Sequence, residues 1–374
     1  MRPIGCSAAL LACPGGANAL LHSPFSARRF DSGIVSNPTK PVRLGIVGCG
    51  AVTREMHLPA FIQSPHVEVT YLCDRITKNT QLAKQEYGLP DARVTAEVKD
   101  FAGHVDAALV AVPPKFHAPV TCELLAMGID VLCEKPIALS TAEARQMSDA
   151  AKKHGRILSV GFVTRFNRNA EVFRRIVADP LIGEIQEVIA EAGSVMGWIM
   201  TSDAYFNKKL TLGGAFFDSG VHLIDRVVDL FGDVTDIAYE DDSYGGVECN
   251  ANLTGKLTIA GRAVPCRMSF SWTHGLLNGV KVIGTHGTAE VKYLDPDALV
   301  VTRTVGGEPL ELGVRYQGAA PNPYILQIED FARAVRTRGT PKVTAESATM
   351  SLAIIERAYA ARTPMKQPWV EVNR

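Results

Sequence analysis

Short apolar segments alternate with longer amphipathic ones between residues 42 and 162. The apolar segments are typical of buried strands and lie at residues 42–47, 67–73, 105–112, 130–133 and 156–162. The pattern predicts helices between them, ending at Phe61 and then covering 77–87, 117–127 and 141–154. Strands that alternate with helices form βαβ units, and right-handed crossovers between them build a doubly wound parallel sheet. We therefore predict an α/β domain over residues 41–163.

The pattern changes after about residue 169, where strand-like segments follow one another with few helices. They lie within 183–194 and at 234–240, 247–260, 262–272, 279–283, 288–293 and 299–305, and helices are expected at 217–231, 324–338 and 344–362. Consecutive strands without helical crossovers favour a large, mostly antiparallel sheet. The expectation is an α+β domain over residues 164–374, whose closing helices are candidates for packing back onto the first domain.

Residues 1–40 differ in composition from the rest of the chain. They are rich in Ala, Ser, Gly and Pro, and the only acidic residue among them is Asp31. We expect a disordered leader, with an export signal and an organelle transit peptide as alternatives. The segment is left out of the reasoning on the fold.

The net charge of the chain argues against some classes of binding partner. Lys and Arg together number 39 and so do Asp and Glu, so the chain has no net charge to attract nucleic acid or an anionic membrane surface. No apolar run is long enough to cross a membrane. None of the eight cysteines forms a C-x-x-C pair, which favours reduced thiols. We expect a cytoplasmic protein that binds neither nucleic acid nor membrane.

The segment Gly48-Cys49-Gly50-Ala51-Val52 lies between the first strand and the first helix. Glycines at this position allow a tight turn and let the backbone approach a pyrophosphate at a helix N-terminus. Thr53 stands where the G-x-G-x-x-G pattern has its third glycine, and its Cβ is expected to push the helix slightly away from the strand. We assign Gly48, Gly50, Ala51 and Val52 to dinucleotide binding.

Asp74 ends the second strand, where a carboxylate can accept hydrogen bonds from the adenosine ribose hydroxyls. The same carboxylate repels the 2′-phosphate of NADP, so NAD is the expected cofactor. Arg75 follows directly and could pair with that phosphate, which leaves NADP possible. The alternative for Asp74 is a cap at the strand end.

Glu134-Lys135-Pro136 ends a strand at the same edge of the sheet. A lysine held there can donate to a substrate oxygen and stabilise negative charge as it develops. A surface ion pair is the alternative for these two charges.

Gly213 and Gly214 lead into a helix on which Asp218 and His222 are four residues apart and share one face. A histidine near its unperturbed pKa of ~6.5 is suited to accept a hydroxyl proton, and Asp218 or Asp225 would orient its ring. A metal site and a structural histidine in the core are the alternatives. No further His or Cys is placed to complete a metal set, so no metal is expected.

Together these residues have a family pattern. Gly48 and Gly50, Asp74, Val112-Pro113-Pro114 with His117, Glu134-Lys135-Pro136, Gly161-Phe162 with Arg165-Phe166-Asn167, and Gly213-Gly214 with Asp218, Gly220, His222 and Asp225 resemble the Gfo/Idh/MocA oxidoreductases. The resemblance covers about residues 42–368. It implies an NAD(P)-binding Rossmann domain followed by a domain that binds substrate and often mediates oligomerisation, so a homodimer or homotetramer is expected.

The resemblance also implies roles for individual residues. Lys135, Asp218 and His222 would act at the substrate carbinol, and Pro113, His117, Glu134 and Lys135 would lie at the cofactor. We assign Arg165, Trp198 and Tyr205 to the substrate, the last two on a loop over residues 197–212. The alternatives are an ion pair for Arg165 and a place in the core for Trp198.

The expected reaction is hydride transfer between NAD(P) and a secondary alcohol of a sugar, cyclitol or sugar derivative. His222 would take the hydroxyl proton while Lys135 holds the same oxygen. One alternative is a redox-neutral glycoside cleavage or epimerisation through oxidation, elimination, addition and reduction. The other is a regulator that binds a dinucleotide without catalysis.

Overall fold

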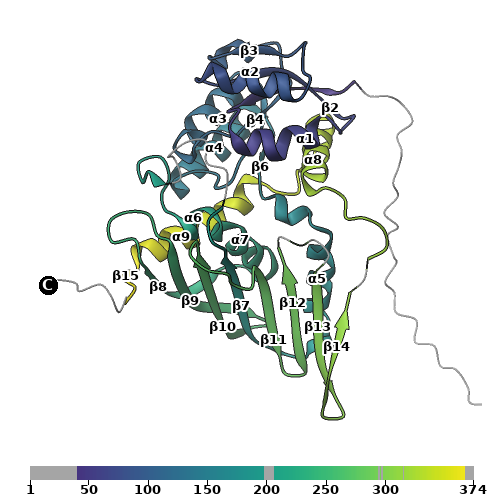
Figure 1. The fold of residues 1–374 in the computed structure, drawn as a ribbon, viewed down its shortest axis with the longest axis vertical. Helices are drawn as coiled ribbons and strands as arrows, with labels where there is room; N and C mark the ends of the chain where they lie inside the picture. Colours follow the sequence, from purple (N-terminus) through teal and green to yellow (C-terminus); the bar gives the residue numbers. More distant parts are fainter. Residues whose placement is uncertain (1–39, 198–205, 294, 296–297, 315, 367–374) are drawn as a thin grey trace, which may run out of the picture. The chain divides into compact units, whose positions relative to one another are not determined.

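The computed structural model describes residues 40–197, 206–293, 295, 298–314 and 316–366, which form two β-sheets with helices packed on both (Figure 1). The first sheet has six strands in the order β3-β2-β1-β4-β5-β6. The second has nine, in the order β14-β13-β12-β11-β7-β10-β9-β8-β15. The predicted fold class, a doubly wound sheet followed by a large and mostly antiparallel one, is confirmed.

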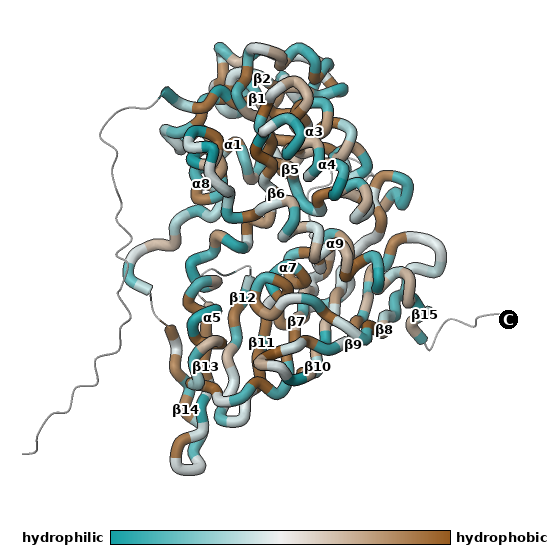
Figure 2. The backbone as a smooth tube through the Cα atoms, turned by 180° about the vertical axis from the view of Figure 1, so that it is seen from behind, coloured by the Kyte–Doolittle hydropathy of each residue, from teal (hydrophilic) through white to brown (hydrophobic). Residues whose placement is uncertain are grey.

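The six-stranded sheet is parallel throughout. Its strands are β1 (Val42–Val47), β2 (Val67–Cys73), β3 (Arg93–Thr95), β4 (Ala107–Val110), β5 (Asp130–Cys133) and β6 (Leu158–Val160). All four residues of β4 and of β5 are buried, as expected of strands covered on both faces, and Figure 2 colours this middle of the sheet as hydrophobic. The strand order reverses beside β1, and ligands bind at such a point outside the carboxyl ends of the strands.

Helices cover both faces of the parallel sheet, and one of them comes from the end of the chain. They are α1 (Leu58–Phe61), α2 (Thr77–Glu86), α3 (His117–Ala126), α4 (Thr141–His154) and α8 (Pro323–Thr337). Phe331 of α8 is buried in one core cluster with Leu44 of β1 and Phe61 of α1. The described residues contain no helix that is long and apolar enough to cross a membrane.

The nine-stranded sheet is antiparallel except where β7 pairs with β10 and β8 pairs with β15. Its strands are β7 (Ile185–Gly193), β8 (Val234–Asp241), β9 (Asn250–Ile259), β10 (Arg262–Ser271), β11 (Gly279–Gly284), β12 (Gly287–Lys292), β13 (Leu299–Val305), β14 (Glu308–Gly313) and β15 (Arg362–Pro364). Helices α6 (Ala215–Asp218), α7 (Gly220–Phe231) and α9 (Ala345–Ala360) pack against it (Figure 1), and α5 (Arg168–Ala178) contacts β12.

The structure departs from the predicted elements in two ways. The helix predicted over 217–231 is divided at Ser219 into α6 and α7, which places a break between Asp218 and His222. Strands β3, β14 and β15 and helix α5 were not predicted. All six residues of β14 are exposed, and its short Leu310-Glu311-Leu312 alternation does not correspond to a buried face.

A buried ion pair joins the end of the parallel sheet to the helices of the second sheet. Arg165 follows β6, and its guanidinium donates to Asp225 on α7 through Nε (2.7 Å) and Nη2 (2.6 Å). The Arg165 side chain is 6% exposed and that of Asp225 is 0% exposed. Ser351 on α9 donates to the same carboxylate at 3.1 Å. Three segments that lie far apart in the sequence therefore meet at one carboxylate.

Removing this carboxylate is expected to destabilise the fold strongly. Asp225→Ala removes both hydrogen bonds that Arg165 donates to the carboxylate and leaves its buried guanidinium with the longer, 3.4 Å ion pair to Asp229, so the free energy of unfolding should fall by about 3 kcal/mol. The measurement is urea unfolding followed by circular dichroism. The matched control is the double variant Arg165→Met with Asp225→Leu, which removes both charges and should recover most of the loss. A single variant as stable as the wild type would show that the pair does not hold the segments together.

Candidate functional site

The glycine loop after β1 forms a tight turn with open space on one side. Gly48 has a φ of +94°, and a Cβ there would overlap the carbonyl of Ala111 on the neighbouring strand. Its N–H donates to the carbonyl of Cys73 at 2.8 Å, which ties the loop to the end of β2. A Cβ at Gly50 would meet no protein atom within 4 Å, so the loop is bare there. This arrangement fits a phosphate that approaches the backbone.

Thr53 closes the loop. Its hydroxyl donates to the carbonyl of Gly48 at 2.6 Å, and the residue is fully buried. The chain continues as a single π-helical turn over Thr53–His57 before α1 begins. The expected displacement of the helix by the Thr53 Cβ stays a prediction, and the side chain supplies a hydrogen bond that a glycine could not make.

Asp74 lies beside this loop at the end of β2. Its Oδ2 accepts the N–H of Cys49 at 2.9 Å, and its Oδ1 accepts the N–H of Ile76 at 2.8 Å. Asp74 is half-buried and Arg75 is exposed. The carboxylate therefore braces the glycine loop and caps its own strand end, and it stays at the edge where a ribose would lie.

Lys135 reaches from the end of β5 to the end of α6. Its ammonium donates to Asp218 Oδ1 at 2.9 Å and to the backbone carbonyl of Asp218 at 3.0 Å. The two side chains are 17% and 30% exposed, so the pair remains accessible. The predicted meeting of lysine and aspartate is present. The predicted bond from Asp218 to the His222 ring is not, because the carboxylate is turned toward the lysine.

His222 lies on the first turn of α7, close to this pair. Its ring packs edge-on against Phe162 and nearly parallel to Tyr293, with centroids 6.1 and 6.4 Å away. Burial, followed by the positive charges of Lys135 and Arg226, lowers the pKa of His222 well below 6.5. Its Nδ1 is buried and has no hydrogen-bond partner among the described residues. The imidazole is therefore neutral near pH 7 and is ready to accept a proton.

Neither aspartate orients the His222 ring. Asp225, the second candidate, is bound to Arg165 and Ser351. Packing against Phe162 and Tyr293 holds the ring instead. The i,i+4 and i,i+3 spacings placed the right residues on one side of the segment, but Lys135 draws the Asp218 carboxylate away from the ring and Arg165 draws that of Asp225.

A buried histidine that the sequence reasoning missed supports the lysine turn. His57 ends the π-helical turn, and its Nε2 lies 2.6 Å from Glu134 Oε1, while Glu134 Oε2 accepts the N–H of Lys135 at 3.0 Å. Burial would raise the pKa of Glu134, but the hydrogen bond and charge of His57 outweigh it and the pKa is lowered. The Glu134 carboxylate was assigned above to the cofactor. In the structure it bridges His57, in the turn after the glycine loop, and the backbone N–H of Lys135.

His117 is also held by the protein itself. Its Nδ1 lies 2.8 Å from the carbonyl of Pro136 and its Nε2 lies 2.8 Å from that of Val112, and a neutral ring donates to one of the two. The residue is 1% exposed. We correct the assignment of the His117 imidazole as a cofactor ligand, because both ring nitrogens contact backbone carbonyls in the loops that follow β4 and β5. Pro113, at the end of one of these loops, is half-buried.

Of the three substrate residues assigned from the sequence, the structure describes Arg165. Trp198 and Tyr205 lie outside the described residues. Arg165 is committed to Asp225, the ion-pair alternative noted above. Tyr293, which no motif marked, stacks on His222. Burial raises the pKa of its phenol, while the charge of Lys135 lowers this pKa and that of Asp218 raises it. An aromatic residue at the end of a β-strand gave no signal of this kind in the sequence.

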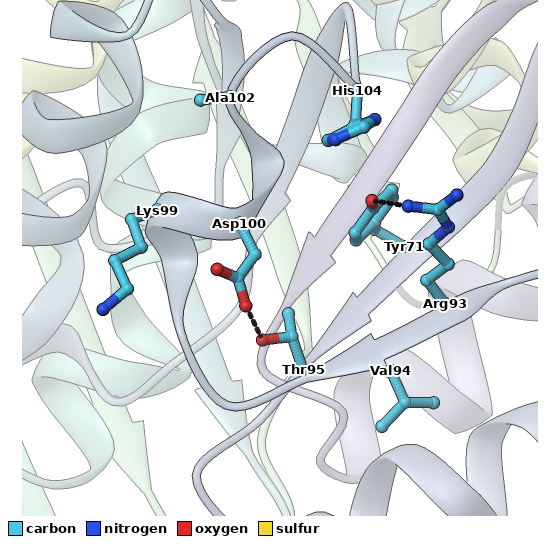
Figure 3. A pocket seen from close by; sticks show the side chains of 8 residues that line it. All are labelled: Tyr71, Arg93, Val94, Thr95, Lys99, Asp100, Ala102 and His104. Atoms are coloured by element: carbon cyan, nitrogen blue, oxygen red, sulfur yellow. Dashed lines mark hydrogen bonds between the residues drawn. The ribbon is translucent and has the colours of Figure 1, made fainter.

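A hollow of about 450 Å³ at the edge of the parallel sheet lies away from these residues (Figure 3). It is lined by Tyr71, Arg93, Val94, Thr95, Lys99, Asp100, Ala102 and His104. Strands β2, β1 and β4 separate β3 from β5, which at about 4.8 Å per strand puts the hollow roughly 19 Å from the strand of Lys135. In the part of the chain that the structure describes, no group of three or more His, Cys, Asp or Glu could hold a metal.

The fold and the loop define a class of protein, an oxidoreductase with an NAD-binding Rossmann domain. Residues 42–162 match the model of the oxidoreductase family with that fold, and residues 171–290 match the C-terminal domain of the Gfo/Idh/MocA family. The chain belongs to the Gfo/Idh/MocA family of oxidoreductases.

Characterised relatives cover part or most of the chain. D-glucoside 3-dehydrogenase of Escherichia coli (strain K12) is 30% identical over 197 residues, which are 52% of this chain and 55% of that protein. The rhizopine catabolism protein MocA of Rhizobium meliloti is 27% identical and covers 84% of this chain and 93% of its own length. The aldose-aldose oxidoreductase of Caulobacter crescentus shares the fold, with a TM-score of 0.76 at 22% identity over 86% of this chain and 97% of that one.

Replacing the carboxylate at the end of β2 is expected to change the choice of cofactor. Asp74→Ser removes the charge that repels a 2′-phosphate but keeps an oxygen near the Cys49 N–H, so the ratio of kcat/KM with NADP to that with NAD should rise roughly tenfold, or about 1.4 kcal/mol. Asn79→Ala is the control, because Asn79 donates to Asp74 and carries no charge. An unchanged ratio would show that the carboxylate does not face the ribose.

His222 is expected to make stability depend on pH. Its pKa is lower in the folded protein than the ~6.5 of the unfolded chain, so the unfolded chain binds the proton first. The contribution of neutral His222 to the free energy of unfolding is complete above pH ~6.5. It is lost as the pH falls below that value, by up to about 1.4 kcal/mol per pH unit. Urea unfolding on both sides of that pH measures it. His222→Asn should show a shallower dependence, and equal slopes would contradict the expectation.

Proposed function

We propose that the chain transfers a hydride between NAD and a secondary alcohol of a sugar, cyclitol or sugar derivative. The observation that carries the proposal is the Lys135–Asp218 pair beside a neutral His222, at the carboxyl edge of a sheet whose glycine loop is bare at Gly50. An ammonium, a carboxylate and an uncharged imidazole together can bind and deprotonate a hydroxyl group. The oxidoreductase family of the chain supports the same reaction class.

His222 takes the part of the base. Its lowered pKa keeps the ring unprotonated at neutral pH, and its partly exposed ring leaves room for a hydroxyl group to donate to it. In the reverse direction the protonated ring returns the proton to the oxygen. The charge of Lys135 lowers the pKa of the ring and so makes the protonated ring a stronger acid.

Lys135 binds the same oxygen and stabilises the negative charge that grows on it as the proton leaves. Asp218 accepts two hydrogen bonds from the ammonium, through its side chain and its carbonyl, and so orients the charge of Lys135 at the carboxyl edge of the parallel sheet. When bound, NAD supplies the hydride acceptor. Gly48, Gly50 and Asp74 are the residues that would hold its pyrophosphate and ribose.

Relatives support the substrate class. One acts as a D-glucoside 3-dehydrogenase and another, similar in fold, as an aldose-aldose oxidoreductase. Several hydroxyl groups on one ring would let a substrate use donors and acceptors beyond the reacting carbon. Tyr293, which stacks on His222, extends the polar surface next to the base.

We also propose that the protein is a cytoplasmic homodimer or homotetramer. Burial alternates over Val188–Ala192 of β7 and Val280–Ile283 of β11, with Val188, Ala190, Val280 and Val282 fully buried. On the other face of these strands Ile189 and Ile283 are only partly buried, and these apolar side chains suit a contact with a second copy.

The proposal predicts that Lys135 is needed for turnover. A panel of polyols, sugars and glycosides is assayed with NAD and with NADP, and NADH absorbance reports net oxidation. Lys135→Ala should lower kcat about 10²–10³-fold, because it removes the donor to the developing oxyanion. Lys115→Ala is a control on a lysine outside the pair. Unchanged turnover in Lys135→Ala would overturn its role, and cleavage without NADH release would favour the redox-neutral reaction.

A further inference from the structure

The Gly213-Gly214 segment is shaped by its own protein neighbours. A Cβ at Gly213 would overlap the Tyr359 hydroxyl of α9, and a Cβ at Gly214 would overlap the carbonyl of Glu248. Both glycines are buried. The two residues therefore need to be glycines because the backbone lies directly on Glu248 and Tyr359.

Glu248 lies just before β9 and accepts three successive backbone N–H groups. Its Oε1 accepts from Gly214 at 2.8 Å and from Phe216 at 3.1 Å, and its own carbonyl accepts from Ala215 at 2.9 Å. The Tyr359 hydroxyl donates to the same Oε1 at 2.9 Å. Glu248 is 2% exposed. One buried residue thus satisfies the N–H groups at the start of α6, which have no partner within a helix.

Helix α6 is a single turn, so contacts that fix the position of its first residues also fix the position of its last residue. It begins at Ala215 and ends at Asp218. Lys135 donates both to the carboxylate and to the backbone carbonyl of Asp218. The position of its ammonium therefore depends on the backbone of α6 as well as on the rotamer of Asp218. A shift of this turn would move both acceptors away from Lys135.

A second contact holds the same region from the strand side. The indole N–H of Trp272 donates to the hydroxyl of Ser219, the residue after Asp218, at 3.1 Å, and the backbone N–H of Trp272 donates to the carbonyl of Cys249 at 2.8 Å. Cys249 directly follows Glu248. The segment 248–249 therefore contacts α6 at its start and, through Trp272, at its end.

We propose that Glu248 is a positioning residue of the site: it holds α6 so that the carboxylate and the carbonyl of Asp218 both bind Lys135. Glu248 does not touch the substrate, and its effect passes through the backbone of residues 214–218. The inference rests on the proposed function for its effect on turnover. The structural part of the inference, that the Lys135–Asp218 contact depends on Glu248, does not rest on the proposed function.

Two substitutions separate positioning from folding. Glu248→Ala removes the acceptor and should lower kcat by about tenfold or more, because small displacements of a catalytic group are costly, while the KM for NAD changes little. Glu248→Gln keeps an Oε1 acceptor for both N–H groups and should stay within about threefold of the wild type. Should Glu248→Ala fail to fold, Glu248→Asp, which withdraws the carboxylate by one methylene, replaces it with the same expectation.

Asp130 provides the matched control. It is a buried carboxylate, 2% exposed, at the opposite end of β5 from Lys135, and it binds Arg338. Asp130→Ala should lower stability and leave kcat unchanged. A loss of kcat in this variant equal to that in Glu248→Ala would show that any buried carboxylate has the same effect, and would overturn the proposal.

Crystal structures of the wild type and of Glu248→Ala, or of Glu248→Asp in its place, give a readout that does not need activity. We expect the Lys135 ammonium to lose its hydrogen bond to the Asp218 carbonyl and carboxylate in the variant. An unchanged contact, or an altered contact with full kcat, would overturn the positioning role. If the wild type turns over no compound of the panel, the proposed function fails, and the comparison of the two structures still decides this inference.

Discussion

The ammonium of Lys135 bound to Asp218 is the contact on which the site depends, because it joins two segments that the chain builds separately. Lys135 ends a strand of the parallel sheet, and Asp218 ends a single helical turn that packs on the nine-stranded sheet. Both acceptors, the carboxylate and the backbone carbonyl, belong to Asp218, so two hydrogen bonds to one residue hold the Lys135 ammonium. The same cation lowers the pKa of His222. In the proposed reaction, the binding of the substrate oxygen and the protonation state of His222 thus both depend on Lys135.

Buried polar groups surround this contact, and most of them are satisfied by the protein. His57 and Glu134 brace the backbone of Lys135, while Glu248 braces the turn of Asp218. Such groups are expensive to bury without partners, and they are effective at fixing one arrangement when all partners are present. The Nδ1 atoms of His57 and of His222 are exceptions, since neither has a partner among the described residues. Aromatic packing, and no aspartate, orients the His222 ring.

Much of the fold could be predicted because its signals are local. The apolar runs that contain β4 and β5 and the glycine after α4 mark their elements within a few residues. Gly48, Asp74 and Lys135 could be assigned to one edge because parallel strands end on the same side of a sheet. The partners of Asp218 and Asp225 could not be predicted. Both lie within reach of His222 on a helix, and only the positions of Lys135 and Arg165 decide where each carboxylate turns.

The sequence by itself determined the class of fold, the glycine loop and the set of residues that carry charge at the site, since these follow from periodicity and from the chemistry of each side chain. The tertiary structure decided which of those residues meet. It paired Lys135 with Asp218, placed His57 and Glu248 behind them, and removed His117 and Arg165 from the list of ligand contacts. The physical reason is that an ion pair or a buried hydrogen bond depends on distances between segments far apart in the chain, and no local pattern encodes those distances.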